Sequence, residues 1–214
     1  HDIDTPLSVA YAANDAFLQF ADDVGRKTRE NYLKMSLEQL KKLSGMIEQI
    51  LSMSMNRQKT FTLHKEMIDL KKTISEIVEQ QRMKTKKPVD ISLKLVPNDI
   101  QVNADRQHFM QIINNICDNA VKYSNEQVRI GISCTKDTEG KVIISISDNG
   151  IGISKPHQQH IFDKFYRVPS GNLHDVKGYG LGLYYVATMM RLHGGDISVE
   201  SEKGKGTTFN LLFR

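Results

Sequence analysis

The residues most suited to chemistry lie on one predicted helix, residues 113–123. Asn115, Asn119 and Lys122 stand at i, i+4 and i+7 and form a polar stripe on an otherwise apolar segment. Because asparagine is a weak helix former, this stripe costs helix stability. Amide oxygens suit Mg²⁺, which prefers oxygen ligands and keeps waters, and a lysine can meet a phosphate. The stripe is a candidate site for both, with a solvated helix face as the alternative.

Glycines form four clusters, at 148–153, 178–183, 194–195 and 204–208. Glycine allows the backbone to approach a ligand closely. The cluster at 178–183 begins a predicted helix, where free N–H groups and the helix dipole favour phosphate. It lacks the Gly-Lys-Ser/Thr ending of a P-loop, and no βαβ unit surrounds it as in a dinucleotide site. Each cluster alone is also consistent with a tight turn.

Composition excludes several classes of protein. The 214 residues are 39% hydrophobic and 25% charged, which is typical of neither a disordered nor a membrane chain. No apolar run approaches the roughly 20 residues that span a bilayer. Cys117 and Cys134 form no disulfide framework or metal cluster and are interpreted as small apolar residues. The net charge of +4 permits an anionic partner without identifying one.

The first 56 residues differ in charge from the rest. They carry six Lys and Arg and eight Asp and Glu, against 23 and 17 in the remainder. Apolar residues recur at helical spacing in this segment, which predicts an antiparallel hairpin with helices at roughly 1–22 and 28–56. The apolar stripe of the first helix is interrupted only by Asn14, and the apolar stripe of the second helix includes Leu33 and Leu37. Such wide apolar faces favour pairing with a second copy into a four-helix bundle. The alternative is that they pack on the second domain.

The remaining residues predict an α+β domain: one mixed sheet with helices on one face. The segment 154–180 has little periodicity, and so long a loop in a compact domain suggests a functional lid. The expected strands are 60–63, 89–95, 100–104, 128–134, 141–147, 196–201 and 207–213, and the expected helices are 70–83, 106–123 and 181–193.

Taken in order, these motifs resemble those of bacterial sensor histidine kinases of two-component systems. Residues 1–7 resemble the phosphoacceptor box, 115–124 the N box, and 161–167 the F box. The glycine clusters at 148–153, 178–183 and 204–209 resemble the three glycine boxes. The resemblance implies a dimerisation and phosphotransfer hairpin at 1–56, a linker and first strand at 57–66, and a catalytic domain at 60–214. That domain would be an α/β-sandwich ATP-binding domain of the histidine kinase, gyrase and heat-shock chaperone type.

The resemblance also implies the contacts of an ATP site. Asn119 would bind Mg²⁺, with Asn115 on the same face of the helix. Lys122 and Arg167 would contact the phosphates, and Tyr123 would line the adenine pocket.

Asp148 would accept a hydrogen bond from the adenine amino group at the bottom of an apolar pocket. The segment 154–180 would be the ATP lid, and Thr208 would lie near the pocket floor. The pocket and lid would be shaped by Gly150, Gly152, Ile153, Phe165, Gly178, Gly180, Leu181, Gly182 and Leu183.

At the other end, the resemblance implies that ATP phosphorylates His1, since a neutral imidazole is a competent nucleophile. Asp2 would act as general base. The phosphoryl group would pass to an aspartate of a response regulator, and Thr5 would place water to dephosphorylate it. Asp4 stands where the family usually has Arg or Lys, so autophosphorylation or regulator docking is expected to be weaker than with Asp4→Lys.

Two other functions fit parts of the sequence: a clamp-type ATPase of the same nucleotide fold, and a degenerate dimeric nucleotide-binding signalling module. The other six histidines are predicted to be surface or packing residues, and His157 and His160 lack the partners of a zinc site. The start at His1 suggests a fragment, expected to be a cytoplasmic domain of a membrane-anchored bacterial protein. No nucleic-acid partner is expected.

Overall fold

The chain divides into two compact units, His1–Phe61 and Thr62–Arg214, in a computed structural model. The structure describes residues 8–12, 14–15, 28–39, 62–85, 87–124, 126–169 and 180–214.

The first unit is helical wherever it is described, at residues 8–12, 14–15 and 28–39. The two helical stretches touch through Asn14, the polar interruption of the predicted apolar stripe, whose Nδ2 donates to Ser36 Oγ at 2.9 Å. Ser36 is buried at this contact, whereas Leu33 and Leu37 are 47% and 52% exposed. The described residues therefore agree with two helices in contact, and the full hairpin stays a prediction.

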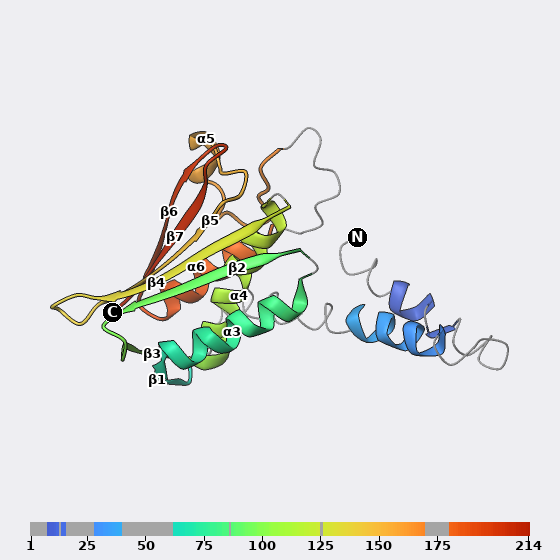
Figure 1. The fold of residues 1–214 in the computed structure, drawn as a ribbon, viewed down its shortest axis with the longest axis horizontal. Helices are drawn as coiled ribbons and strands as arrows, with labels where there is room; N and C mark the ends of the chain where they lie inside the picture. Colours follow the sequence, from blue (N-terminus) through green and yellow to red (C-terminus); the bar gives the residue numbers. More distant parts are fainter. Residues whose placement is uncertain are drawn as a thin grey trace. The chain divides into compact units, whose positions relative to one another are not determined.

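The second unit contains seven strands and four helices within its described residues (Figure 1). In chain order these are β1 Lys65–Asp69, α3 Leu70–Lys84, β2 Val89–Val96, β3 Gln101–Asp105, α4 Arg106–Tyr123, β4 Val128–Lys136, β5 Val142–Asp148, α5 Lys155–Gln158, α6 Gly182–Leu192, β6 Asp196–Glu202 and β7 Gly206–Phe213.

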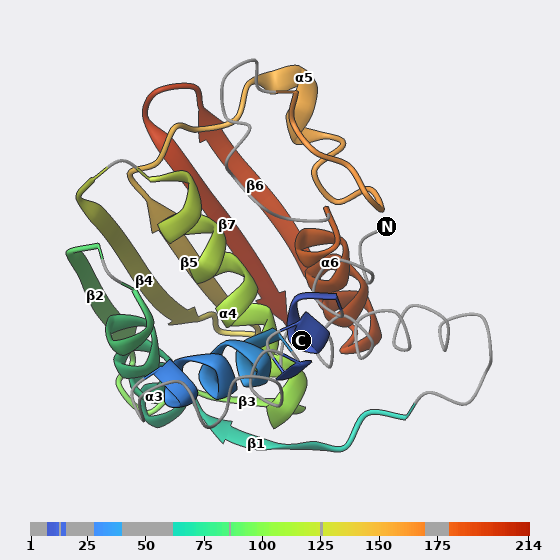
Figure 2. The same ribbon diagram turned by 90° about the vertical axis from the view of Figure 1, so that its right-hand side faces the viewer.

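Five strands form one mixed sheet in the order β2-β4-β5-β7-β6. Only the β2–β4 pair is parallel, and the other three pairs are antiparallel. Helices α3, α4 and α6 cover one face of this sheet (Figure 2). This layer arrangement confirms the α/β sandwich that the sequence predicts.

The expectation of a single sheet is wrong, and residues 62–63, the described part of the expected first strand at 60–63, are not in a strand. Strand β1 begins at Lys65 and pairs only with β3, as a separate two-stranded sheet. Ile68 and Val102 face each other across this pair and are both buried. The strand position is decided by this long-range pairing, which local residue preference cannot reveal.

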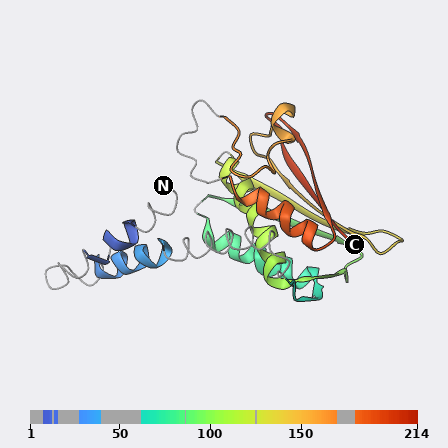
Figure 3. The ribbon, with the colours of Figure 1, turned by 180° about the vertical axis from the view of Figure 1, so that it is seen from behind.

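The core lies between the sheet and helix α4, whose buried face carries Phe109, Ile112, Ile113 and Ile116. Figure 3 shows α6 beside α4 on the same side of the sheet. Asp105 begins α4 as its N-cap, since its carboxylate accepts from His108 N. The helix ends at Tyr123, at the end of the sheet from which β5 leads into the glycine cluster at 148–153.

Candidate nucleotide-binding site

Helix α4 has two polar faces, and one of them is used for packing. Gln81 of α3 is buried, and its Nε2 donates to Asn114 Oδ1 at 3.0 Å and to Asp118 Oδ1 at 2.9 Å. Lys84 adds an ion pair to Asp118 at 2.8 Å. Helix α3 therefore fixes the rotation of α4 about its own axis.

The second polar face, one residue further along, points away from these α3 partners. Asn115 Nδ2 donates to Gln111 O at 2.9 Å, and its Oδ1 would lie 3.0 Å from a Cβ placed on Gly182. The N-terminus of α6 thus lies against the predicted stripe. Asn119 is half-buried, and no hydrogen bond to its amide occurs among the described residues. Its oxygen remains available to a ligand.

The C-terminal end of α4 meets the glycine cluster at 148–153. Tyr123 O accepts from Ile151 N at 3.1 Å, and a Cβ on Gly150 would lie 2.9 Å from the same oxygen. Lys122 Nζ lies 5.0 Å from the centroid of the Tyr123 ring, in cation–π range. Tyr123 is 37% exposed, so the ring and the ammonium stand together at the edge of the site.

Asp148 ends strand β5 with one carboxylate oxygen bound and the other available. Oδ1 accepts from Gly150 N at 2.8 Å and from Thr207 N at 3.2 Å. In the part of the chain that the structure describes, no hydrogen bond reaches Oδ2. Burial raises the pKa of the Asp148 carboxyl, and the two backbone hydrogen bonds offset only part of this rise. An amino group of a ligand would suit this oxygen.

The residue of β7 that meets Asp148 is Thr207, so the structure does not bring Thr208 to the pocket floor as expected. Thr207 pairs opposite Asp148, whereas Thr208 pairs opposite Ser147. Successive side chains of a strand point to opposite faces, so Thr208 lies on the face away from the helices. A difference of one residue in register changes the face completely.

Ser201 of β6 joins two glycine clusters, and sequence reasoning missed it. Its Oγ accepts from Ile153 N at 2.8 Å, and it lies 2.8 Å from Gly206 O and 2.9 Å from Thr207 Oγ1. Gln158 Nε2 adds donations to Ile153 O and Ser201 O at 2.7 and 2.8 Å. The sequence offers one signal for it: side chains of a strand alternate between its two faces, and Ser201 stands at an inward-facing position of β6.

Gly180, two residues before Gly182, packs against the backbone of Phe165 and Tyr166. It adopts φ +68°, and a Cβ there would lie 2.6 Å from the carbonyl carbon of Phe165 and the carbonyl oxygen of Tyr166. Phe165 N donates to Gly180 O at 3.1 Å, and Phe165 itself has φ +65°. Only glycine fits at 180, because both its conformation and its space exclude a side chain.

The match to known families agrees with this geometry. Residues 104–214 match the family of histidine kinase-, DNA gyrase B-, and HSP90-like ATPases. The chain belongs to this ATPase family.

Two curated relatives of this ATPase chain are sensor proteins. The chain is 35% identical to sensor protein RprX of Bacteroides fragilis over 98% of its length, and 30% identical to sensor histidine kinase WalK of Bacillus subtilis over 99%. It spans 41% and 34% of these relatives' own lengths. The solved structure of full-length ShkA, 20% identical, has the same fold, with a TM-score of 0.74 over 98% of this chain and 43% of that one.

The predicted phosphoacceptor residues His1, Asp2 and Thr5 lie outside the described residues, and so does Gly178 of the predicted lid. Arg167 is described and exposed, and Phe165 is 58% exposed. Leu181 is buried, whereas Ile153 and Leu183 are half-buried. The structure thus joins Asn115 to Gly182, and it joins Gly150 to both Tyr123 and Asp148.

The described residues provide no ready-made metal cage. No group of three His, Cys, Asp or Glu side chains among them could hold a metal ion. Mg²⁺ is commonly bound by one or two protein oxygens together with substrate phosphates. Asn119 fits that pattern, since it offers one amide oxygen and leaves the other ligands to a substrate and water.

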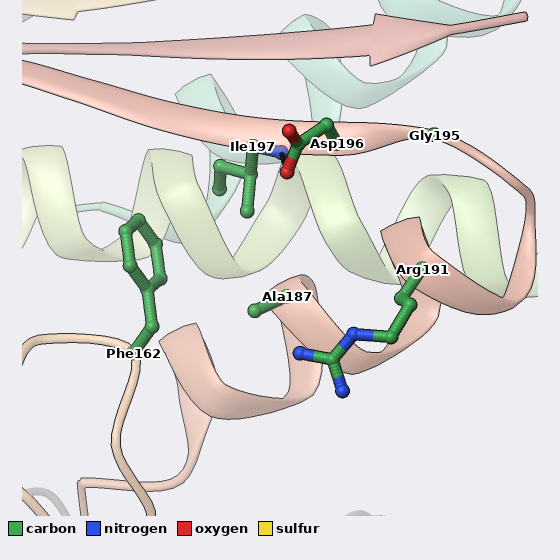
Figure 4. A pocket seen from close by; sticks show the side chains of 6 residues that line it. All are labelled: Phe162, Ala187, Arg191, Gly195, Asp196 and Ile197. Atoms are coloured by element: carbon green, nitrogen blue, oxygen red, sulfur yellow. Dashed lines mark hydrogen bonds between the residues drawn. The ribbon is translucent and has the colours of Figure 1, made fainter.

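A pocket of about 200 Å³ elsewhere in the ATPase domain belongs to a different surface (Figure 4). It lies between α6 and β6 and contains none of the predicted site residues. Its lining is Phe162, Ala187, Arg191, Gly195, Asp196 and Ile197. No described helix is long and apolar enough to cross a membrane.

Proposed function

We propose that the chain is the kinase core of a sensor histidine kinase, an ATP-dependent protein histidine kinase. The observation that carries this proposal is the meeting of Asn115 with Gly182 midway along α4, and of Gly150 with both Tyr123 and Asp148 at the C-terminal end of that helix. Family membership and two relatives described as sensor proteins support it.

ATP is the proposed substrate. The unbound Oδ2 of Asp148 would accept from the adenine amino group, with Tyr123 beside the base. Lys122 and Arg167 would neutralise phosphate charge, and the N–H groups at the start of α6 would face phosphate oxygens. The neighbour ShkA is described in complex with AMPPNP, an ATP analogue, which supports this substrate class.

Mg²⁺ is the proposed cofactor, with Asn119 as its protein ligand and Asn115 beside it. When bound, the ion would neutralise charge on the transferred phosphate. The protein would supply position and electrostatics, which is the usual contribution of an enzyme to phosphoryl transfer.

The proposed acceptor is His1 on the first unit. An imidazole nitrogen would attack the γ-phosphorus, the bond to ADP would break, and Asp2 would hold the proton of the other nitrogen. The phosphoryl group would then pass to an aspartate of a response regulator, and Thr5 would position water for the separate hydrolysis that releases inorganic phosphate from that aspartate. The first unit would also make the homodimer.

The test is incubation of the chain with γ-labelled ATP and Mg²⁺. We expect label on the protein that is acid-labile, alkali-stable and absent in His1→Ala. Turnover of ATP without labelled protein would favour the clamp-type ATPase, and absence of nucleotide binding would favour the degenerate signalling module. Asp4→Lys in the same assay is expected to label faster than the natural chain.

A further inference from the structure

The imidazole of His193, just after α6, is buried and bonded at both nitrogens. Nδ1 lies 2.7 Å from Met189 O, and a carbonyl only accepts, so Nδ1 carries the hydrogen. Nε2 accepts from the backbone N–H of Asp105 at 3.0 Å. The ring is 5% exposed and packs edge-on against Phe213 at 6.1 Å. These contacts assign a neutral ring in one tautomer.

The partner of this ring begins helix α4. Asp105 is the N-cap of α4, and its carboxylate accepts from His108 N at 3.2 Å and His64 N at 2.9 Å. In the first turn of α4, His108 Nδ1 lies 2.8 Å from the hydroxyl of Tyr185 on α6. The start of α4 is therefore joined to α6 at two points.

The same cluster receives the beginning of the second unit. Lys65, the first residue of β1, donates from Nζ to His193 O at 3.0 Å. Together with the His64 amide, it connects the segment that follows the unit boundary at Phe61 to both helices. Lys65, Asp105, His108 and Tyr185 are the titratable groups that surround His193 in the described residues.

Helix α6 links this cluster to the nucleotide site. Its 11 residues form a rod of about 16 Å, with His193 after one end and Gly182 at the other. Gly182 packs closely against Asn115, since a Cβ placed on Gly182 would lie only 3.0 Å from Asn115 Oδ1. A shift of α6 along or about its axis therefore changes the space at Asn115 directly.

Resting on the proposed function, we propose that His193 is a positioning residue for ATP binding. Its neutral ring fixes α6 against the start of α4 and so sets the position of the Gly180–Gly182 turn. Lys65 bonds the start of the second unit to the backbone of His193. A change in the chain that leads from the first unit can therefore reach the nucleotide site through α6. Burial lowers the pKa of His193, which helps to keep the ring neutral.

The first test compares His193→Phe with His193→Gln in the full 214-residue chain. Phenylalanine keeps the packing on Phe213 but cannot accept from Asp105, whereas glutamine offers an acceptor oxygen near the place of Nε2. By calorimetric titration with ATP and Mg²⁺, we expect at least tenfold weaker binding for Phe and less than threefold for Gln. His64→Ala is the matched control, because only the backbone of His64 takes part.

The second test addresses the connection to the chain entry. Lys65→Met is expected to weaken ATP binding two- to fivefold, and Lys72→Met, a lysine of α3 whose ammonium makes no described contact, is expected to leave it unchanged. Nitrogen NMR shifts of His193 should show a protonated Nδ1 and an unprotonated Nε2 at neutral pH.

The outcomes separate this inference from the function on which it rests. If the natural chain binds no ATP, the proposed function fails and this inference falls with it. If the natural chain binds ATP and a folded His193→Phe binds within twofold of it, only the inference is overturned. Equal losses in the Phe and Gln variants would also overturn it, because packing rather than the hydrogen bond would then be responsible.

Discussion

At the scale of single residues, Asp148 shows the conflict between stability and binding. Its buried charge is unfavourable to the folded state, because burial raises its pKa above the usual 3.8. A group whose pKa is raised on folding contributes stability that is present below the unfolded pKa and lost as pH rises through the folded pKa. At neutral pH the ionised carboxylate therefore serves the ligand rather than the fold.

We predict that Asp148→Asn raises the melting temperature at pH 7 by a few degrees and weakens ATP binding at least tenfold. The asparagine Oδ1 can still accept from Gly150 N and Thr207 N, but its amino group cannot accept from adenine. The gain in melting temperature should shrink as pH falls toward 4. Thermal unfolding across pH and calorimetric titration measure both effects, and a variant that melts lower at pH 7 would contradict this account of Asp148.

Gly182 gives a second residue-scale prediction. Alanine is the better helix former by about 1 kcal/mol, so Gly182→Ala should not lower the melting temperature. It should weaken ATP binding several-fold, because the new methyl presses on Asn115 Oδ1. A double-mutant cycle with Asn115→Ala checks the cause: once Asn115 is truncated, Gly182→Ala should not weaken ATP binding further. Additive losses would show that the two residues act separately.

At the scale of elements, helix α4 was predictable from sequence to the residue, and the pairing of strands was not. Its limits, Arg106 and Tyr123, match the helix expected at 106–123, and in the structure Asp105 caps its start. The position of β1 and the choice of Thr207 over Thr208 depend on partners far along the chain. Ser201 escaped notice, and His193 was predicted only as a surface or packing residue, because the backbone atoms that they bond are brought to them by the fold.

The contact of α3 with α4 carries the element-scale prediction. Gln81→Ala removes the donor that Asn114 and Asp118 share in a part-buried contact, which should cost about 1–3 kcal/mol of unfolding free energy. Glu79→Ala on the same helix removes only an exposed ion pair with Arg82 and should cost less than about 0.5 kcal/mol. Urea denaturation measures the difference, provided that the dependence of the unfolding free energy on urea concentration is the same in both variants. Equal losses of unfolding free energy would contradict the assigned role of Gln81.

At the scale of the whole molecule, the first unit must find a partner for its apolar residues. Leu33 and Leu37 are about half exposed although they belong to the predicted apolar stripe, and Asn14 and Ser36 already satisfy each other inside the unit. A second copy would cover the stripe and complete a four-helix bundle.

We predict that the chain is a dimer at micromolar concentration, and that Leu33→Lys with Leu37→Lys makes it a monomer, because each would bury a charge in the interface. Sedimentation velocity measures the state, with Lys34→Ala as the control on the same helix. If the natural chain sediments as a monomer, the stripe is covered in some other way, and the monomeric chain would have to phosphorylate His1 within itself.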